Sequence, residues 1–185
     1  MARKSDSTLD RARILDAAYA LLDEAGLDAI TMRALAARLG VQAPALYWHI
    51  HDKADLMALL ARDIYAGARP TAEAGTPERW LLALGRGLAT ALRRHRDAAR
   101  LLASASPNRP PTADEAQAMA QPLTDWGYSV EQALAAQAAV ISLTLGWAVY
   151  RGNAPMAEYL SSMFDLDAAY DQGLVRLVEG LTART

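Results

Sequence analysis

The chain has 185 residues, of which 52% are hydrophobic and 22% charged, so it is long enough for one or two compact units and too apolar for a disordered chain. It contains no cysteine, which excludes disulfide crosslinks, Cys-ligated zinc and a cysteine nucleophile. The net charge of −2 is no signature of nucleic-acid binding, and the first 53 residues carry seven cations against seven anions. A DNA-binding function must therefore depend on where individual side chains lie.

The first 66 residues predict four helices, because apolar residues recur there with a period near 3.6. Thr31 and Asp52 are suited to cap helix N-termini, and Gly26 and Gly40 are suited to end helices in a left-handed turn. Pro44 fits the first turn of a helix, where its missing N–H costs nothing. The predicted helices span residues 14–25, 32–39, 44–49 and 52–66.

The remainder of the chain shows the same helical periodicity and no sustained strand-like alternation. Residues 66–76 are rich in Gly, Pro and Thr and mark a domain junction, and residues 106–111 form a second break. Thr112–Glu115 and Ser129–Gln132 are capping boxes that open helices. The helices predicted here span residues 77–94, 97–103, 113–126, 130–150 and 166–182, with a loop over 152–165. The fold class is therefore all-α, with about nine or ten helices.

Two short helices joined at Gly40 form the most informative pattern in the chain. The second of them carries more polar and aromatic side chains than a narrow apolar stripe can bury, and the major groove of DNA accepts such a helix. In this interpretation Gln42 reads adenine and Arg33 reads guanine, while small Ala43 and Ala45 allow close approach. The alternative is that Tyr47, Trp48 and His49 pack between helices of an ordinary bundle.

The segment Thr31–Leu56, with its Leu-Tyr-Trp-His run followed by Lys53, resembles the DNA-binding domain of the tetracycline-repressor family. The resemblance continues through His95-Arg-Asp97, Gly127-Tyr-Ser129 and Thr144-Leu-Gly-Trp147. It implies a three-helix helix-turn-helix domain over residues 1–53, a connecting helix and linker over 54–75, and a ligand-binding and dimerisation domain over 76–185. It also implies that the following residues contact DNA: Thr31, Arg33, Gln42, Ala43, Pro44, Ala45, Tyr47, Trp48, His49 and Lys53.

The resemblance implies a homodimer in which the helices over 130–150 and 166–182 form a four-helix interface; packing within one chain is the alternative. Small or apolar residues on those helices are the expected contacts: Ala135, Ala139, Gly146, Gly173, Leu177 and Gly180. An apolar effector pocket is expected in each subunit, although each candidate also suits an ordinary core position. The candidates are Trp80, Leu84, Leu88, Leu101, Leu102, Met119, Leu123, Trp126, Ile141, Leu145 and Tyr150.

One departure from the family concerns metal binding. Tetracycline repressors carry a magnesium-ligating histidine where this chain has Leu102, and His95 is expected to end a helix and not to bind metal. We therefore expect a metal-free, apolar or amphipathic effector and no cofactor.

No Gly-rich phosphate loop, metal-binding histidine pair or Gly-x-Ser-x-Gly elbow supports the competing class, an enzyme. Polar residues within 130–150 argue against a membrane span, and residues 1–6 do not resemble a signal peptide. The sequence predicts a cytoplasmic transcription regulator, a repressor that binds a palindromic operator and is released by its effector. A helical adaptor that has lost DNA binding is the alternative.

Overall fold

The computed structural model describes residues 9–70, 75–105 and 109–183, which form ten α-helices and one 3-10 turn with no strand. The predictions for residues 1–6, and for parts of the junction and of the second break, lie outside these ranges. The helices are α1 Arg11–Ala25, α2 Met32–Leu39, α3 Ala43–Leu46, α4 Lys53–Ala68, α5 Pro77–Arg94, α6 Ala98–Ser104, α7 Ala113–Thr124, α8 Val130–Gly152, α9 Ala154–Ser161 and α10 Leu166–Thr182, with η1 at Leu27–Ala29. The all-α prediction is confirmed.

Four helices begin at capping residues that the sequence predicts. Thr31 accepts a hydrogen bond from the Ala34 amide at 3.0 Å, and Asp52 accepts one from the Asp55 amide at 2.8 Å. Both predicted capping boxes form, at Thr112 and at Ser129. These bonds satisfy amides that have no partner inside the helix, so the chain enters each helix at a defined residue.

Several predicted element boundaries differ from the structure by one to three residues, and one predicted loop contains a helix. Helix α3 ends at Leu46, because Tyr47–His49 form a turn in which the amides of His49 and Ile50 both donate to the Leu46 carbonyl. Helix α8 continues to Gly152. The loop predicted over 152–165 is wrong, since it contains α9, which begins after the Asn153 cap. Met156, Tyr159 and Leu160 have the i, i+3, i+4 spacing of an apolar stripe, but no residue of α9 is buried in this chain.

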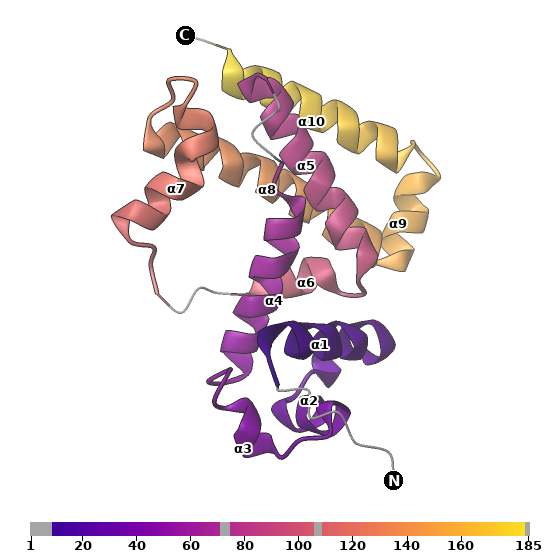
Figure 1. Ribbon diagram of the computed structural model, residues 1–185. Coiled ribbons are helices and arrows are strands. Elements are labelled where there is room, and N and C mark those ends of the chain that lie inside the picture. The colour runs from indigo at the N-terminus through magenta and orange to yellow at the C-terminus, as the bar shows by residue number, and fades with distance from the viewer. Residues whose placement is uncertain (1–8, 71–74, 106–108, 184–185) are drawn as a thin grey trace.

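Two apolar cores divide the molecule. The first contains residues of α1 to α4 and continues into α5 and α6, whereas the second joins α5, α7, α8 and α10. Helix α5 contributes to both, with Leu88 in the first core and Leu84 in the second. Figure 1 shows the consequence: α1 to α3 form one end of the molecule, α7 to α10 lie at the other, and α4 runs from one end toward the other.

Helices α4 and α5 approach closely at one glycine. A Cβ placed on Gly87 would lie 2.6 Å from the carbonyl oxygen of Ala68, the last residue of α4. Only a residue without a side chain allows two backbones to come this near. The end of α4 is therefore held directly against α5.

Helix α8 is long and apolar enough to cross a membrane, with a mean hydropathy of 1.5. It packs against α5, α7 and α10, and Val140 and Thr144 on it are buried there. One side of α8 is thus packed inside this chain, and 28% of its apolar stretch is buried.

Candidate functional site

The turn between α2 and α3 has the geometry of a helix-turn-helix. Gly40 adopts a left-handed conformation, with φ 68°, and its amide donates back to the last turn of α2. The Val41 amide also donates back, to the Ala36 carbonyl. Leu46 and Leu35 are fully buried behind this turn, which anchors α3 on α2.

The residues predicted to contact DNA lie on α2, α3, the following turn and the first turn of α4, and at the N-caps of α2 and α3, which are Thr31 and Gln42. Thr31, Arg33, Gln42, Pro44 and Lys53 are exposed. Ala43, Ala45 and His49 are half-buried, so part of each side chain is covered by the rest of the chain. The Thr31 hydroxyl also caps α2, which leaves its remaining hydrogen-bonding capacity for a phosphate.

Two aromatic side chains at the end of α3 project into solvent. Trp48 is 88% exposed and Tyr47 is 52% exposed. The alternative in which these rings pack between helices does not occur within this chain. These two neighbouring rings therefore offer an exposed aromatic surface beside the turn.

Charges around α3 are distributed unevenly. Arg38 forms a two-pronged ion pair with Glu24, with both distances 2.6 Å, and this pair holds the pKa of Glu24 below its usual range. Arg33 and Lys53 have no ion-pair partner among the residues that the structure describes. Their positive charges are therefore available to a polyanion despite the neutral total.

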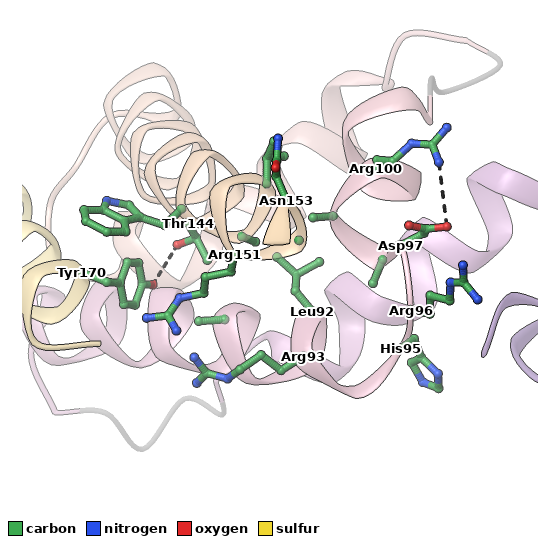
Figure 2. A pocket seen from close by; sticks show the side chains of 17 residues that line it. Leu92, Arg93, His95, Arg96, Asp97, Arg100, Thr144, Arg151, Asn153 and Tyr170 are labelled. Carbon is green, nitrogen blue, oxygen red and sulfur yellow. Dashed lines mark hydrogen bonds and ion pairs between the residues drawn. The ribbon is translucent and has the colours of Figure 1, made fainter. Parts of the chain in front are cut away.

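A cleft of about 640 Å³ opens between α5, α6 and α8, with Tyr170 contributed by α10 (Figure 2). Its apolar surface comes from residues such as Leu92, Ala98 and Ala148. Its polar lining is dominated by arginines: Arg93, Arg96, Arg100 and Arg151. No local sequence pattern marks these arginines as a group, because three come from α5, α6 and the bend between them and the fourth comes from α8.

Tyr170 and Thr144 close one end of the cleft and are both buried. Their hydroxyl oxygens lie 3.0 Å apart, and the Tyr170 hydroxyl donates to the Gly85 carbonyl at 2.9 Å. Burial raises the pKa of Tyr170, so this hydroxyl keeps its proton across the physiological range.

The opposite end of the cleft is the corner between α5 and α6. This corner also contacts α1 and η1, at the helix-turn-helix end of the molecule. Asp97 accepts a hydrogen bond from the Leu27 amide at 3.0 Å, and the Arg96 amide donates to Asp23 at 3.0 Å. His95, the residue that ends α5 as predicted, stacks on Tyr19 at 4.2 Å between ring centroids. The cleft therefore shares this contact region with α1 and η1.

None of the residues predicted to line an effector pocket lines this cleft. Trp80, Leu84, Leu88, Leu101 and Leu123 are fully buried core residues, and the Trp80 indole N–H has no partner among the described residues. The other predicted residues vary in exposure: Leu102, Trp126, Ile141 and Leu145 are half-buried, and Met119 and Tyr150 are exposed.

The predicted dimer contacts lie on the outer sides of α8 and α10. Ala135, Gly146 and Gly180 are exposed, and Ala139, Gly173 and Leu177 are half-buried. A Cβ placed on Gly146, Gly173 or Gly180 would meet nothing within 4 Å. The small residues of this stripe are thus not required by packing inside the chain.

The residues present do not fit a magnesium chelate at the family's position. Leu102 is apolar and packs against the first core. Within the described ranges, no group of three or more His, Cys, Asp or Glu side chains is arranged to hold a metal ion. The position of Leu102 therefore offers magnesium no ligand.

Comparison with known proteins agrees with this geometry. Residues 14–60 match the bacterial regulatory proteins of the tetR family, and residues 69–158 match the tetracyclin repressor-like C-terminal domain. The class A tetracycline repressor protein from transposon 1721 of Escherichia coli is 33% identical, over 92% of this chain and 89% of that protein. This chain belongs to the tetracycline-repressor family.

Two solved structures of the family show how far the likeness extends. The repressor from Acinetobacter baumannii AYE is 30% identical with a TM-score of 0.74, over 94% of this chain and 96% of that one. The class A repressor, solved in complex with 5a,6-anhydrotetracycline and magnesium, is 32% identical with a TM-score of 0.73, over 96% and 100% of the two chains. This family member is accordingly a ligand-responsive, DNA-binding transcription regulator.

Proposed function

We propose that this regulator is a cytoplasmic repressor that binds a palindromic operator as a homodimer and is released by a small effector without magnesium. The observation that carries the proposal is the exposed Tyr47–Trp48 pair at the end of a short helix in helix-turn-helix geometry. Residues 1–53 are the reading head, 54–75 the link, and 76–185 the regulatory domain.

Specific DNA binding follows from the exposed side chains around α3. Gln42 and Arg33 suit base edges, whereas Lys53 at the start of α4 suits a phosphate. Gln42→Ala or Arg33→Ala should cost about 1–3 kcal/mol and relax the preference at one base pair. Lys53→Ala should weaken binding to all sequences alike and flatten the salt dependence by about one unit.

Gel-shift titrations on DNA flanking the protein's own gene test this proposal. Arg176→Ala is a matched control, since Arg176 lies on α10 and pairs with Glu179 on the same helix. The control should leave operator affinity unchanged. Equal affinity of the wild-type protein for operator and random duplex would refute specific binding.

Dimerisation is supported by the exposed small residues of α8 and α10. Two recognition helices in a palindrome must lie about 34–36 Å apart or farther, and a two-fold dimer sets that spacing. Gly173→Glu is the sharpest test, because the space around Gly173 is empty in one chain and the variant should fold. It should yield monomers and lose operator binding together, whereas Gly67→Glu, also in open space but on α4, should remain dimeric. A monomeric wild type in sedimentation at micromolar concentration would refute the dimer.

Release requires that effector and operator favour different positions of α4. This helix joins the reading head to α5, where Ala68 is held against Gly87. Any factor by which the effector lowers operator affinity must equal the factor by which the operator lowers effector affinity. A shift from 99% to 1% occupancy needs about 5.5 kcal/mol of differential binding, which two effector sites per dimer can share.

The independence from magnesium is proposed because Leu102 supplies no metal ligand. Operator titrations with apolar and amphipathic effectors should give the same release with and without EDTA. A requirement for magnesium would refute this part of the proposal.

A further inference from the structure

We propose that the cleft between α5, α6 and α8 binds an aromatic carboxylate, with its ring beside Trp147 and Tyr170 and its carboxylate on Arg93 and Arg151. The effect of such a ligand on DNA binding rests on the proposed function, whereas its binding to the cleft does not.

The charge of the cleft selects for an anion. Its lining contains four arginines and one aspartate, Asp97, so arginine is its most frequent charged residue; Asp167 and Asp28, which pair with three of these arginines, lie outside the lining. A cationic ligand would be repelled there, and a neutral apolar ligand would leave the guanidinium groups without a new partner. Arginine in a partly enclosed site is the side chain that recognises planar carboxylates best.

Two of these arginines come from different walls and converge on one carboxylate. Arg93 on α5 and Arg151 on α8 both donate to the same oxygen of Asp167, at 3.4 and 2.7 Å. Figure 2 shows both guanidinium groups directed toward the space beside the Thr144–Tyr170 pair. The protein therefore already contains a place where one carboxylate bridges two arginines.

The residue that now bridges them is easily displaced. The Asp167 side chain is 73% exposed, whereas that of Arg151 is 25% exposed. A solvated ion pair contributes at most about 1 kcal/mol, so a ligand carboxylate offered from inside the cleft can replace it. The neighbouring Asp165 does not compete, because its side chain caps α10 by accepting from the Asp167 and Ala168 amides.

The surface next to the arginines suits an aromatic ring. Trp147 and Tyr170 meet edge to face, with ring centroids 6.4 Å apart, and both line the cleft. The Thr144 and Tyr170 hydroxyls lie within hydrogen-bonding distance of each other and of the Val140 and Gly85 carbonyls, so both of their protons have acceptors inside the chain. Ala89 and Leu92 add apolar surface. The volume of about 640 Å³ lies within the usual range for sites that bind small molecules.

The far end of the same cleft gives the ligand a route to the reading head. Arg96, Asp97 and Arg100 line it, and each also contacts the DNA-binding end, through Asp23, Leu27 and Asp28 respectively. Helix α5 carries Arg93 and leads directly into the bend at Arg96 and Asp97, so a ligand that moves the end of α5 will change these contacts. Under the proposed function, the aromatic carboxylate should therefore lower operator affinity.

The test compares 2-naphthoate with its uncharged isostere 2-naphthamide, using calorimetry on the purified full-length chain without DNA. Naphthoate should bind at least tenfold more tightly than naphthamide, and added salt should weaken naphthoate alone. Arg151→Gln should lower the affinity for naphthoate at least tenfold and leave the affinity for naphthamide unchanged. Arg93→Gln, at a more exposed position, should act in the same direction if Arg151→Gln folds poorly.

Arg176→Gln is the matched control and should bind naphthoate like the wild type. Equal affinity for acid and amide, no binding of naphthoate, or full naphthoate affinity in both cleft variants would each overturn the inference. Operator affinity measured without ligand separates the two proposals. If the protein prefers naphthoate but binds no specific DNA, the proposed function is refuted and the inference about the cleft stands. If it binds specific DNA but shows no preference for naphthoate, the inference about the cleft is refuted and the proposed function stands.

Discussion

Replacing Gly87 with alanine should force α4 away from α5. The added Cβ would lie 2.6 Å from the Ala68 carbonyl oxygen, whereas ordinary van der Waals contact begins at 3.4 Å, so the end of α4 must move by about 0.8 Å. The obstructing atom belongs to the backbone and cannot rotate aside. Overpacking of this kind typically costs about 1–3 kcal/mol.

Gly67→Ala on α4 separates this cost from the helix propensity of alanine. Both changes replace a helical glycine, so both gain up to about 1 kcal/mol of propensity, but a Cβ on Gly67 meets nothing within 4 Å. The difference in the free energy of unfolding between the two variants therefore reports the packing term alone, about 1–3 kcal/mol.

Urea denaturation of both variants at one fixed protein concentration measures this difference, since the stability of a dimer depends on concentration. In thermal unfolding, each kcal/mol of lost stability should lower the Tm by about 2–4 °C in a chain of this size. Gly87→Ala should also change operator affinity, because the displaced helix carries the reading head. Equal stabilities of the two variants would refute the inference that α4 is held rigidly against α5.

Three further changes test other contacts. The fluorescence of Trp48 should shift to the blue or be quenched when operator DNA covers it, and an unchanged Trp48 contribution, isolated with Trp48→Phe, would contradict its place in the interface. Asp97→Ala should lower the free energy of unfolding by about 2 kcal/mol, because it leaves the Leu27 amide without its charged acceptor; unchanged stability would show that this contact is not needed. Asp171→Asn should lower stability at neutral pH by about 0.5 kcal/mol. The hydrogen bond from Arg86 holds the pKa of Asp171 below its usual value, so this contribution is present above the unfolded-state pKa and is lost as the pH falls through the folded-state pKa; a difference between variant and wild type that persists in strong acid would contradict this assignment.

Helix type and position followed directly from local chemistry. Capping residues such as Thr31, Asp52 and Thr112, and the breaking glycine Gly40, act on amides and carbonyls within a few residues of themselves. Their effect does not depend on the rest of the fold, so the sequence alone placed five helix starts at the observed residue and three more within one residue of it. The reading helix was identified by the resemblance of the short Leu-Tyr-Trp-His segment to a known family, which also requires only neighbouring residues.

Helix α9 and the length of α3 did not follow from local signals. The apolar residues Met156 and Tyr159 of α9 stay exposed in this chain, and α3 ends at Leu46 because Leu46 and Ile50 are both fixed in the first core with a turn between them. Both features depend on which side chains are covered by other helices, and the periodicity of the sequence does not contain that information.

The location of the cleft was decided by tertiary structure alone. The large apolar residues expected to line a pocket, such as Trp80 and Leu84, pack against one another and are fully buried. Arg93 and Arg151 are 58 positions apart in the sequence, and only the crossing of α5 and α8 brings both of them to Asp167. Sequence determines which residues are apolar or charged, but whether an apolar residue fills the core or lines a cavity depends on which surfaces the packed helices leave uncovered.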